Sequence, residues 1–360
     1  MHIGLPKEIK NHEYRVGLTP ASVRELCAHG HRVLVQSGAG AAIGLSDAMY
    51  QSAGATLAAD AAEVFAWADM IVKVKEPQPQ ECAMLRPGQI LYTYLHLAPD
   101  PEQTQALIKS GAVCIAYETI TGPGGGLPLL APMSEVAGRM AVQAGAAHLE
   151  KSKGGMGVLL GGVPGVPPAK VVILGCGVAG THAAEMAVGM RASVTAIDRS
   201  LKRLRELDQQ FRGDVHTLYS TADAIEREIR DADLVIGAVL VPGASAPRLV
   251  TEAMVRGLRP GTVLVDIAID QGGCFETSRP TTHADPTFVK HGVVHYCVTN
   301  MPGAVARSSA FALNHATLPY VQAIAGLGWE AAAARDPGLA AGLNVSAGRI
   351  VHPAVARALT

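Results

Sequence analysis

An apolar run, a glycine-rich loop and a helix follow one another near the middle of the chain, and this unit constrains the fold more than any other segment. Residues 171–174 lead directly into Gly175-Cys176-Gly177-Val178-Ala179-Gly180. The first glycine permits a tight turn, the second lets a pyrophosphate approach the backbone, and the third lets helix and strand pack closely. The N–H groups that open the helix, at about Val178, would face the phosphates. This loop predicts a dinucleotide site whose contacts are Gly175, Gly177, Val178, Ala179 and Gly180.

An acidic residue strengthens this interpretation. Asp198 ends the next apolar run, residues 193–197, and follows Gly180 by 18 residues. A carboxylate at this spacing can accept hydrogen bonds from both hydroxyls of an adenosine ribose. Arg199, Lys202 and Arg203 form a basic cluster that could tolerate a 2′-phosphate, but Asp198 would repel one, so NAD is favoured over NADP. The alternative is a glycine turn in an α/β domain that binds nothing.

The alternation of strand and helix continues after Asp198. Four further apolar runs complete a six-stranded parallel sheet that is buried on both faces; they span residues 215–219, 233–240, 262–268 and 293–298. Helical stretches lie between most of the strands, for example at residues 201–210 and 221–229. The first 130 residues repeat this pattern without the glycine loop. Their expected strands are 2–5, 32–36, 71–75, 90–94 and 113–117, with helices near 20–28 and 101–109. The fold class is therefore α/β, with two doubly wound Rossmann-like domains and an active-site cleft between them.

Domain boundaries follow from the segments that join these elements. Residues 121–128 are rich in glycine and proline and cannot continue any element. A helix of small residues, about 134–150, comes next; it either crosses between domains, joins subunits, or is an ordinary buried helix. A helix at 308–326 is not expected to be followed by another strand, and it is expected to return to the N-terminal domain. We assign residues 1–128 plus 306–360 to a substrate and catalytic domain, and residues 129–305 to an NAD-binding domain.

Composition limits the classes of partner. The 360 residues are 49% hydrophobic and 17% charged, with a formal net charge of −1. No nucleic-acid or membrane partner is expected, because either would need basic patches. No apolar run approaches the roughly 18 residues of a membrane span. The first residues lack the apolar stretch of a signal peptide, and the six cysteines are scattered, so we expect reduced thiols in a cytoplasmic protein.

Polar side chains stand where strands of the N-terminal domain are expected to end. Lys75 ends strand 71–75, with Lys73 two residues earlier on the same face, and His96 follows strand 90–94. Arg15 lies between the first strand and the first helix. Because ligands of such sheets lie beyond the carboxyl ends of the strands, these groups are expected to point into the cleft. Asp270 follows the fifth strand of the other domain, near the expected nicotinamide.

These groups suit hydride transfer on a small amino or keto acid. An arginine can clamp an α-carboxylate through two hydrogen bonds, and a lysine ammonium can polarise a carbonyl or imine. A histidine can pass protons near neutral pH, and a carboxylate nearby can orient it. Each residue also has a structural interpretation. Lys75 could be a solvated lysine, Arg15 the counter-ion of Glu13, Asp270 a turn acid before Gly272, and His96 one of thirteen histidines without a role.

Several long motifs are similar to those of a known family. They include Gly4-Leu5-Pro6-Lys7-Glu8-Ile9-Lys10-Asn11, Val74-Lys75-Glu76-Pro77, Leu95-His96-Leu97-Ala98-Pro99, Asp270-Gln271-Gly272-Gly273 and Thr299-Asn300-Met301-Pro302-Gly303-Ala304. Over essentially its whole length the chain resembles the L-alanine dehydrogenases, a group that includes the NAD-binding part of proton-translocating transhydrogenase. The resemblance implies reversible oxidation of L-alanine to pyruvate and ammonium with NAD, in a cytosolic homohexamer.

The resemblance also implies residue roles. Arg15 and Lys75 fall where the family binds the substrate's carboxylate and carbonyl, His96 on the acid/base, and Asp270 on its catalytic partner. Some relatives are associated with magnesium through a Glu/His pair near the C-terminal helix; residues 320–330 contain no such pair, so no metal is expected. Beyond the glycine loop, the expected cofactor contacts are Ser134, Asp198, Arg203, Ser220, Val239, Leu240, Ile267, Asp270, Val298, Asn300 and Met301.

Three other functions stay open at this point. A transhydrogenase NAD-binding subunit would not be expected to carry Lys75, His96 and Asp270-Gln271 together. A regulatory or storage protein that binds NAD without catalysis would be expected to have lost some of these residues. A dehydrogenase of lysine or another large amino acid shares the two-lobed plan, and the sequence does not exclude the acidic or roomy pocket that it would need.

Overall fold

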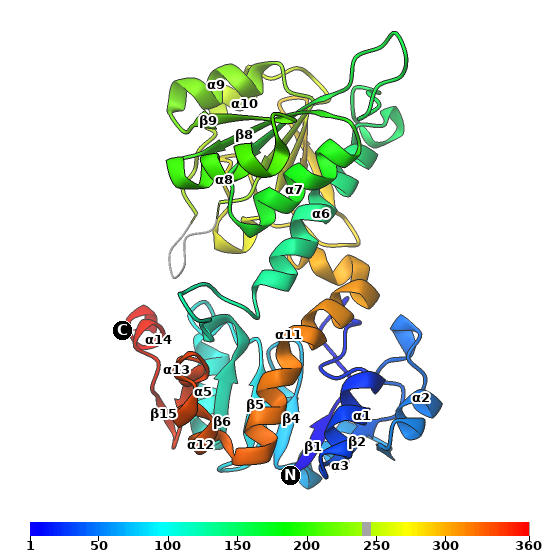
Figure 1. The fold of residues 1–360 in the computed structure, drawn as a ribbon, viewed down its shortest axis with the longest axis vertical. Helices are drawn as coiled ribbons and strands as arrows, with labels where there is room; N and C mark the ends of the chain where they lie inside the picture. The colour runs from blue at the N-terminus through cyan, green and yellow to red at the C-terminus, as the bar shows by residue number, and fades with distance from the viewer. Residues whose placement is uncertain (240–245, 360) are drawn as a thin grey trace. The chain divides into compact units, whose positions relative to one another are not determined.

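The computed structural model describes residues 1–239 and 246–359 and divides the chain into two compact units. Unit 1 comprises Met1–Met133 and Val305–Thr360, and unit 2 comprises Ser134–Ala304. Each unit contains one mainly parallel sheet with helices packed around it (Figure 1). In both sheets the strand order reverses beside the first strand of the unit, as in doubly wound folds. The predicted α/β class with two Rossmann-like units is confirmed.

The sheet of unit 1 has eight strands in the order β15-β14-β6-β5-β4-β1-β2-β3. Strands β1 to β6 are parallel, whereas β14 is antiparallel to β6 and β15 to β14. The bounds are β1 His2–Leu5, β2 Arg32–Gln36, β3 Thr56–Ala58, β4 Met70–Val72, β5 Ile90–Thr93, β6 Val113–Ala116, β14 Leu343–Ser346 and β15 Arg349–Ile350.

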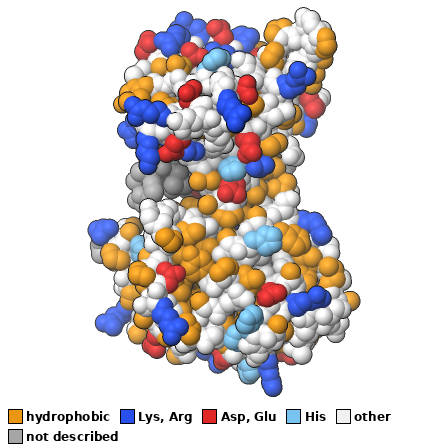
Figure 2. Space-filling model, viewed as in Figure 1, with side chains coloured by type: hydrophobic (Ala, Val, Ile, Leu, Met, Phe, Trp, Pro, Cys, Tyr) orange, Lys and Arg blue, Asp and Glu red, His pale blue; other side chains and the backbone are white. Residues whose placement is uncertain are grey.

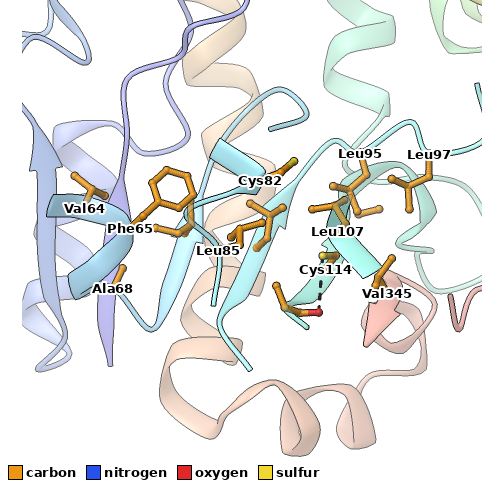
Figure 3. Packing of buried hydrophobic residues seen from close by; sticks show 14 of the residues in the cluster. Val64, Phe65, Ala68, Cys82, Leu85, Leu95, Leu97, Leu107, Cys114 and Val345 are labelled. Carbon is orange, nitrogen blue, oxygen red and sulfur yellow. Dashed lines mark hydrogen bonds between the residues drawn. The ribbon is translucent and has the colours of Figure 1, made fainter. Parts of the chain in front are cut away.

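Helices pack against this sheet through apolar side chains. Figure 3 shows part of the resulting core, in which Phe65 of α3 and Leu107 of α5 lie with Cys114 of β6 and Val345 of β14. The helices and 3₁₀ turns of the unit are α1 Pro20–Ala28, η1 Ala41–Ile43, α2 Asp47–Ser52, α3 Ala61–Trp67, α4 Pro79–Cys82, α5 Pro101–Ser110, η2 Tyr117–Thr119, α11 Ala306–Leu327, α12 Trp329–Arg335, α13 Pro337–Ala340 and α14 Pro353–Leu359.

The expectation that no strand follows the helix at 308–326 was wrong. That helix, α11, belongs to unit 1, where Asn314 accepts a hydrogen bond from the Thr19 N–H at 2.8 Å and donates to the Val16 carbonyl at 3.1 Å. Strands β14 and β15 then add an antiparallel hairpin to the edge of the sheet. Strand β14, Leu-Asn-Val-Ser, mixes apolar and polar residues and β15 has only two residues, so neither forms the continuous apolar run that marks the buried strands.

The sheet of unit 2 has seven strands in the order β12-β13-β11-β10-β7-β8-β9. The six expected strands are present and parallel: β7 Lys170–Leu174, β8 Ser193–Asp198, β9 Val215–Tyr219, β10 Leu234–Gly237, β11 Val263–Asp266 and β13 Val293–Tyr296. The seventh, β12 Thr287–Lys290, is antiparallel to β13 and was missed. Its side chains are partly exposed and mixed in polarity, so it lacks the continuous apolar run of the others.

The helices of unit 2 begin with α6, and the division between the units falls inside this helix. Its small residues permit close packing, because a Cβ at Gly138 would meet the backbone of Ala179 and one at Gly145 would lie 2.6 Å from Leu234. The helices and 3₁₀ turns of this part of the chain are α6 Ala131–His148, η3 Lys151–Lys153, α7 Val178–Gly189, α8 Leu201–Phe211, α9 Ala222–Arg230, α10 Glu252–Arg256, η4 Ile269–Gln271 and η5 Met301–Val305.

Two properties of the described residues are relevant to possible partners: the distribution of charge on the surface, and the length and polarity of the helices. On the face drawn in Figure 2, Lys and Arg side chains are interspersed with Asp and Glu over unit 2, whereas unit 1 shows broad hydrophobic areas. Within residues 1–239 and 246–359, no helix is long and apolar enough to cross a membrane.

A buried charge cluster lies at the end of β4. The Lys73 ammonium donates to Glu8 Oε2 at 2.9 Å and to Glu81 Oε1 at 2.7 Å, and all three side chains are almost fully buried. Burial alone would lower the pKa of Lys73, but the two carboxylates outweigh it and raise that pKa. Lys73 therefore stays charged and links β4 to the segments that carry Glu8 and Glu81.

Lys73→Met should lower the free energy of unfolding by about 3–5 kcal/mol, because it leaves two carboxylates buried without their counter-ion. Urea denaturation followed by circular dichroism measures this change. Lys109→Met is the matched control: Lys109 is exposed on α5, and its loss should change stability by less than about 0.5 kcal/mol. Similar stabilities for the two variants would contradict the structural role of Lys73.

Candidate active site

The glycine loop of unit 2 has the backbone geometry that its sequence predicts. Gly175 has φ +93°, and a Cβ there would lie 2.7 Å from Val239 Cγ2. Helix α7 begins at Val178, and a Cβ on Gly180 would collide with the carbonyl oxygen of Gly175. By contrast, a Cβ on Gly177 would have no neighbour within 4 Å. The first and third glycines are required by packing within the unit, whereas the second opens the backbone to an incoming group.

Asp198 and Arg203 both form hydrogen bonds that stabilise the conformation of the glycine loop. Asp198 accepts hydrogen bonds from the N–H groups of Cys176 and Ser200, each at 2.7 Å. The Arg203 side chain donates through Nε to the Cys176 carbonyl at 2.7 Å and through Nη2 to Thr181 Oγ1 at 2.6 Å. The carboxylate stands at the end of β8, where the ribose of a dinucleotide is expected. The observed contacts give Arg203 a structural role at this loop.

The other expected cofactor contacts of unit 2 fall mainly after the carboxyl ends of its strands. Ser220 follows β9, Val239 follows β10, Ile267 follows β11 and Val298 follows β13. Asn300 has φ +61° and precedes Met301, which is buried at the start of η5, and Ser134 lies on α6. Leu240 lies outside the described residues. Because β9, β10, β11 and β13 are parallel strands of one sheet, the residues that follow them share its carboxyl edge.

Asp270 is the exposed residue of a short turn that the buried carboxylate of Asp266 supports. Strand β11 ends at Asp266 and not at residue 268, and Asp270 is in the 3₁₀ turn η4. Asp266 accepts hydrogen bonds from the Ala268 N–H at 3.1 Å, the Cys274 N–H at 2.9 Å and the Ser278 hydroxyl at 2.6 Å. Burial raises the pKa of Asp266 to about 6, although these donors work in the opposite direction. Asp266 was not singled out from the sequence.

Lys75 lies beyond β4 and not at its end. The strand stops at Val72, so the expectation that Lys73 and Lys75 share one strand face was wrong. Glu8 interrupts the strand pattern by accepting the N–H groups of Val74 at 2.6 Å and Lys75 at 3.4 Å. Lys73 is fully buried, where it pairs with Glu8 and Glu81, whereas Lys75 is partly exposed.

Arg15 lies in the loop between β1 and α1 and is 2% exposed. Its Nε donates to Glu13 Oε1 at 2.7 Å, its Nη2 to Glu13 Oε2 at 2.6 Å and its Nη1 to Met133 Sδ at 3.0 Å. Burial alone would lower the pKa of Arg15, but the hydrogen bonds and charge of Glu13 raise it. Two of the five N–H donors of a guanidinium serve this carboxylate. The counter-ion role that the sequence left open for Arg15 is therefore present, and it fixes the orientation of the guanidinium.

His96 is an exposed residue that follows β5. Its φ is +49°, in the left-handed region that residues other than glycine seldom adopt. Its ring stacks on Tyr94, with centroids 5.8 Å apart and planes 13° apart, and the Tyr94 hydroxyl donates to the Leu129 carbonyl at 2.5 Å. The N–H groups of Leu95 and His96 both donate to Glu118.

The structure brings Arg15, Lys75 and His96 to one edge of the unit 1 sheet, because each follows one of the adjacent parallel strands β1, β4 and β5. The carboxylates that hold them, Glu8, Glu13 and Glu118, were missed as functional candidates. Their signal in the sequence is only an acid shortly after an apolar run, which many surface turns share. Among the described residues, no three His, Cys, Asp or Glu side chains are grouped so that they could hold a metal ion.

Two Rossmann-like units, one with a glycine loop open at Gly177, define a two-domain dinucleotide-binding α/β protein. Residues 4–137 match the family model "Alanine dehydrogenase/PNT, N-terminal domain", and residues 141–353 match "Alanine dehydrogenase/PNT, C-terminal domain". The chain belongs to the alanine dehydrogenase/PNT family, as its sequence motifs predicted.

Individual relatives agree with this assignment. The chain is 61% identical over 358 residues to an alanine dehydrogenase of Halomonas elongata, covering 99% of this chain and 96% of that protein. It is 54% identical to one of Mycolicibacterium smegmatis, with 100% and 97% covered. A solved L-alanine dehydrogenase matches with a TM-score of 0.97 and 52% identity over 99% of both chains. A transhydrogenase from Sinorhizobium meliloti matches with a TM-score of 0.83 and 26% identity, covering 98% of this chain and 100% of that one.

Gly177→Ala and Gly180→Ala form a matched pair that separates binding from packing. Gly177→Ala should change the free energy of unfolding by less than about 1 kcal/mol, because the added methyl group would contact no other atom of the protein. The same methyl group should weaken NADH binding at least about tenfold, because it occupies the space through which the pyrophosphate approaches the loop. Gly180→Ala should destabilise the fold by about 1–3 kcal/mol. Thermal unfolding and fluorescence titration with NADH measure the two effects. Unchanged NADH affinity in Gly177→Ala would contradict this use of the loop.

Asp266→Asn should change how stability depends on pH. Because its pKa is raised from 3.8 to about 6, folded Asp266 holds its proton more tightly than the unfolded chain does. That stabilisation is present below pH 3.8 and is lost as the pH rises through 6. Between these pH values the wild type should lose about 3 kcal/mol more than Asp266→Asn. Urea denaturation at a series of pH values tests this, and parallel curves for the two proteins would contradict it.

Proposed function

We propose that this chain catalyses the reversible oxidative deamination of L-alanine to pyruvate and ammonium, with NAD as the electron acceptor. One observation carries the proposal: Arg15, Lys75 and His96 follow adjacent strands of one sheet in a chain whose relatives are alanine dehydrogenases. A guanidinium, an ammonium and an imidazole at one edge provide the carboxylate binding, carbonyl polarisation and proton exchange that the reaction needs.

The residues of unit 2 fit NAD. Gly177 leaves space beside the backbone for a pyrophosphate, the first N–H groups of α7 can face its charge, and Asp198 can accept ribose hydroxyls with lone pairs that its two backbone donors do not use. Asp198 would also repel the 2′-phosphate of NADP. When bound, the nicotinamide supplies the chemistry of hydride transfer. The remaining cofactor contacts in the proposal are Ser134, Gly175, Val178, Ala179, Gly180, Arg203, Ser220, Val239, Leu240, Ile267, Asp270, Val298, Asn300 and Met301.

The residues of unit 1 account for substrate binding and proton transfer. Arg15, aligned by Glu13, binds the α-carboxylate of the substrate, and the Lys75 ammonium donates toward the oxygen that becomes the pyruvate carbonyl. His96 takes up and returns protons as the substrate amine is replaced by the oxygen of water. Asp270, in unit 2, is proposed as its catalytic partner. In total one L-alanine, one NAD⁺ and one water give pyruvate, ammonium, NADH and one proton.

The cellular setting is also part of the proposal. By its resemblance to the alanine dehydrogenases, we expect the chain to act as a homohexamer in the cytoplasm, on small-molecule substrates and without a metal. A transhydrogenase-like subunit is the competing function, because a transhydrogenase shares the fold. It is less favoured, since sequence identity to that protein is 26% against 61% to an alanine dehydrogenase.

Oxidation of NADH in the presence of pyruvate and ammonium tests the function directly. We expect turnover with pyruvate that depends on ammonium, slower turnover with glyoxylate, oxaloacetate and 2-oxobutyrate, and preference for NADH over NADPH. Each 2-oxo acid without ammonium is the control for simple ketone reduction. NADH binding without turnover on any of these substrates would contradict the proposed dehydrogenase and favour a transhydrogenase-like subunit.

A further inference from the structure

We propose that Glu118 is a positioning residue of the reaction, which holds the His96 backbone in its left-handed conformation and thereby places the imidazole. The inference rests on the proposed function, in which His96 exchanges protons with the substrate. Glu118 lies in η2, directly after β6, and is 22 residues away from His96 in the chain.

The backbone of His96 adopts a conformation that is unfavourable for a residue with a Cβ. At φ +49° its Cβ is crowded by the backbone, which is why side chains other than glycine seldom occupy this region. The residue is exposed, and the stacking of its ring on Tyr94 acts on the side chain and not on the backbone N–H groups. A left-handed residue at a candidate catalytic position needs a specific interaction that stabilises it.

Glu118 provides that interaction. Its Oε1 accepts the His96 N–H at 2.7 Å and the Leu95 N–H at 3.1 Å, and its Oε2 lies 3.3 Å from the same Leu95 nitrogen. Hydrogen bonds from N–H groups to a charged carboxylate are stronger than those to a neutral acceptor. Two successive N–H groups converging on one oxygen fix the direction in which the chain leaves β5.

The segment that carries Glu118 is held from two sides by its neighbouring residues. The neighbouring Tyr117 hydroxyl donates to the Lys73 carbonyl at 2.9 Å, on the side of β4. On the other side the C-terminal segment bonds to the same turn: Asn344 Nδ2 donates to Thr119 Oγ1 at 2.7 Å, and the Thr121 N–H donates to the Gly338 carbonyl at 3.2 Å. The backbone on either side of Glu118 is therefore anchored, so that its carboxylate is presented from a fixed turn to the segment that carries His96.

The ring of His96 has a separate support in Tyr94. With the backbone set by Glu118, stacking on the Tyr94 ring leaves the imidazole a restricted orientation. Proton transfer requires the ring nitrogen to come within hydrogen-bonding distance of the substrate, and a displacement of about 1 Å can cost about a hundredfold in rate. Loss of Glu118 should therefore reduce turnover through His96 without removing any group that touches the substrate.

Steady-state kinetics of three single variants separate this role from a general effect on folding. Glu118→Ala should lower kcat about 10- to 100-fold while changing the KM for NADH less than about threefold. Glu118→Gln, whose amide oxygen can replace Oε1, should recover most of kcat. Glu63→Ala is the matched control elsewhere in unit 1: it removes an exposed carboxylate that accepts the Ala59 N–H at 2.9 Å, and it should lower thermal stability slightly while leaving kcat within about threefold of the wild type.

A double-mutant cycle with His96 then decides the mechanism. If Glu118 acts through His96, adding Glu118→Ala to His96→Ala should cause no further loss of the residual rate, measured at high enzyme concentration over hours. An equal loss in both backgrounds, or failure of Glu118→Gln to recover kcat, would overturn the positioning role. Near-normal turnover of His96→Ala alone would instead remove His96 from the proposed function, and that outcome is distinct from additivity between the two residues.

Discussion

The rest of this structure depends on one kind of interaction: hydrogen bonds from backbone N–H groups beyond the strand ends to side-chain carboxylates. Glu8 holds the segment after β4, Glu118 the segment after β5, Asp198 the glycine loop after β7 and Asp266 the loop after β11. Each ligand-binding edge of a parallel sheet is made of loops, and a loop holds a reactive side chain in place only if its own backbone is fixed. Hydrogen bonds to charged acceptors provide that rigidity.

Buried carboxylates of unit 1 also balance positive charges beside the residues proposed to bind substrate. Glu13 orients Arg15, and Glu8 shares the buried Lys73 with Glu81 beside the segment that carries Lys75. A guanidinium already aligned by one carboxylate loses less side-chain entropy when it binds a second one. The cations of unit 1 are thus preorganised by acids that take no part in the proposed reaction. This arrangement links the stability of the unit to the placement of Arg15 and Lys75.

Much of the fold could be predicted because its signals are local. The glycine loop, the six parallel strands of unit 2 and helix α11 each follow from a continuous pattern of residues. The missed strands have weak local patterns: β12 and β14 mix apolar and polar residues, and β3 and β15 have only three and two residues. The predicted strand 71–75 was too long because Glu8, more than sixty residues earlier, takes the N–H groups of Val74 and Lys75 from the sheet ladder.

The sequence by itself determined the α/β class, the family, the glycine geometry and the identity of the residues proposed to bind substrate and cofactor. These properties depend on residue type and on spacing along the chain. Only the tertiary structure decided that Arg15 is paired with Glu13, that Lys73 is buried while Lys75 is not, and that Glu118 supports a left-handed His96. The physical reason is that hydrogen bonds and burial depend on which segments contact one another in the folded chain, and the spacing of residues along the sequence does not specify those contacts.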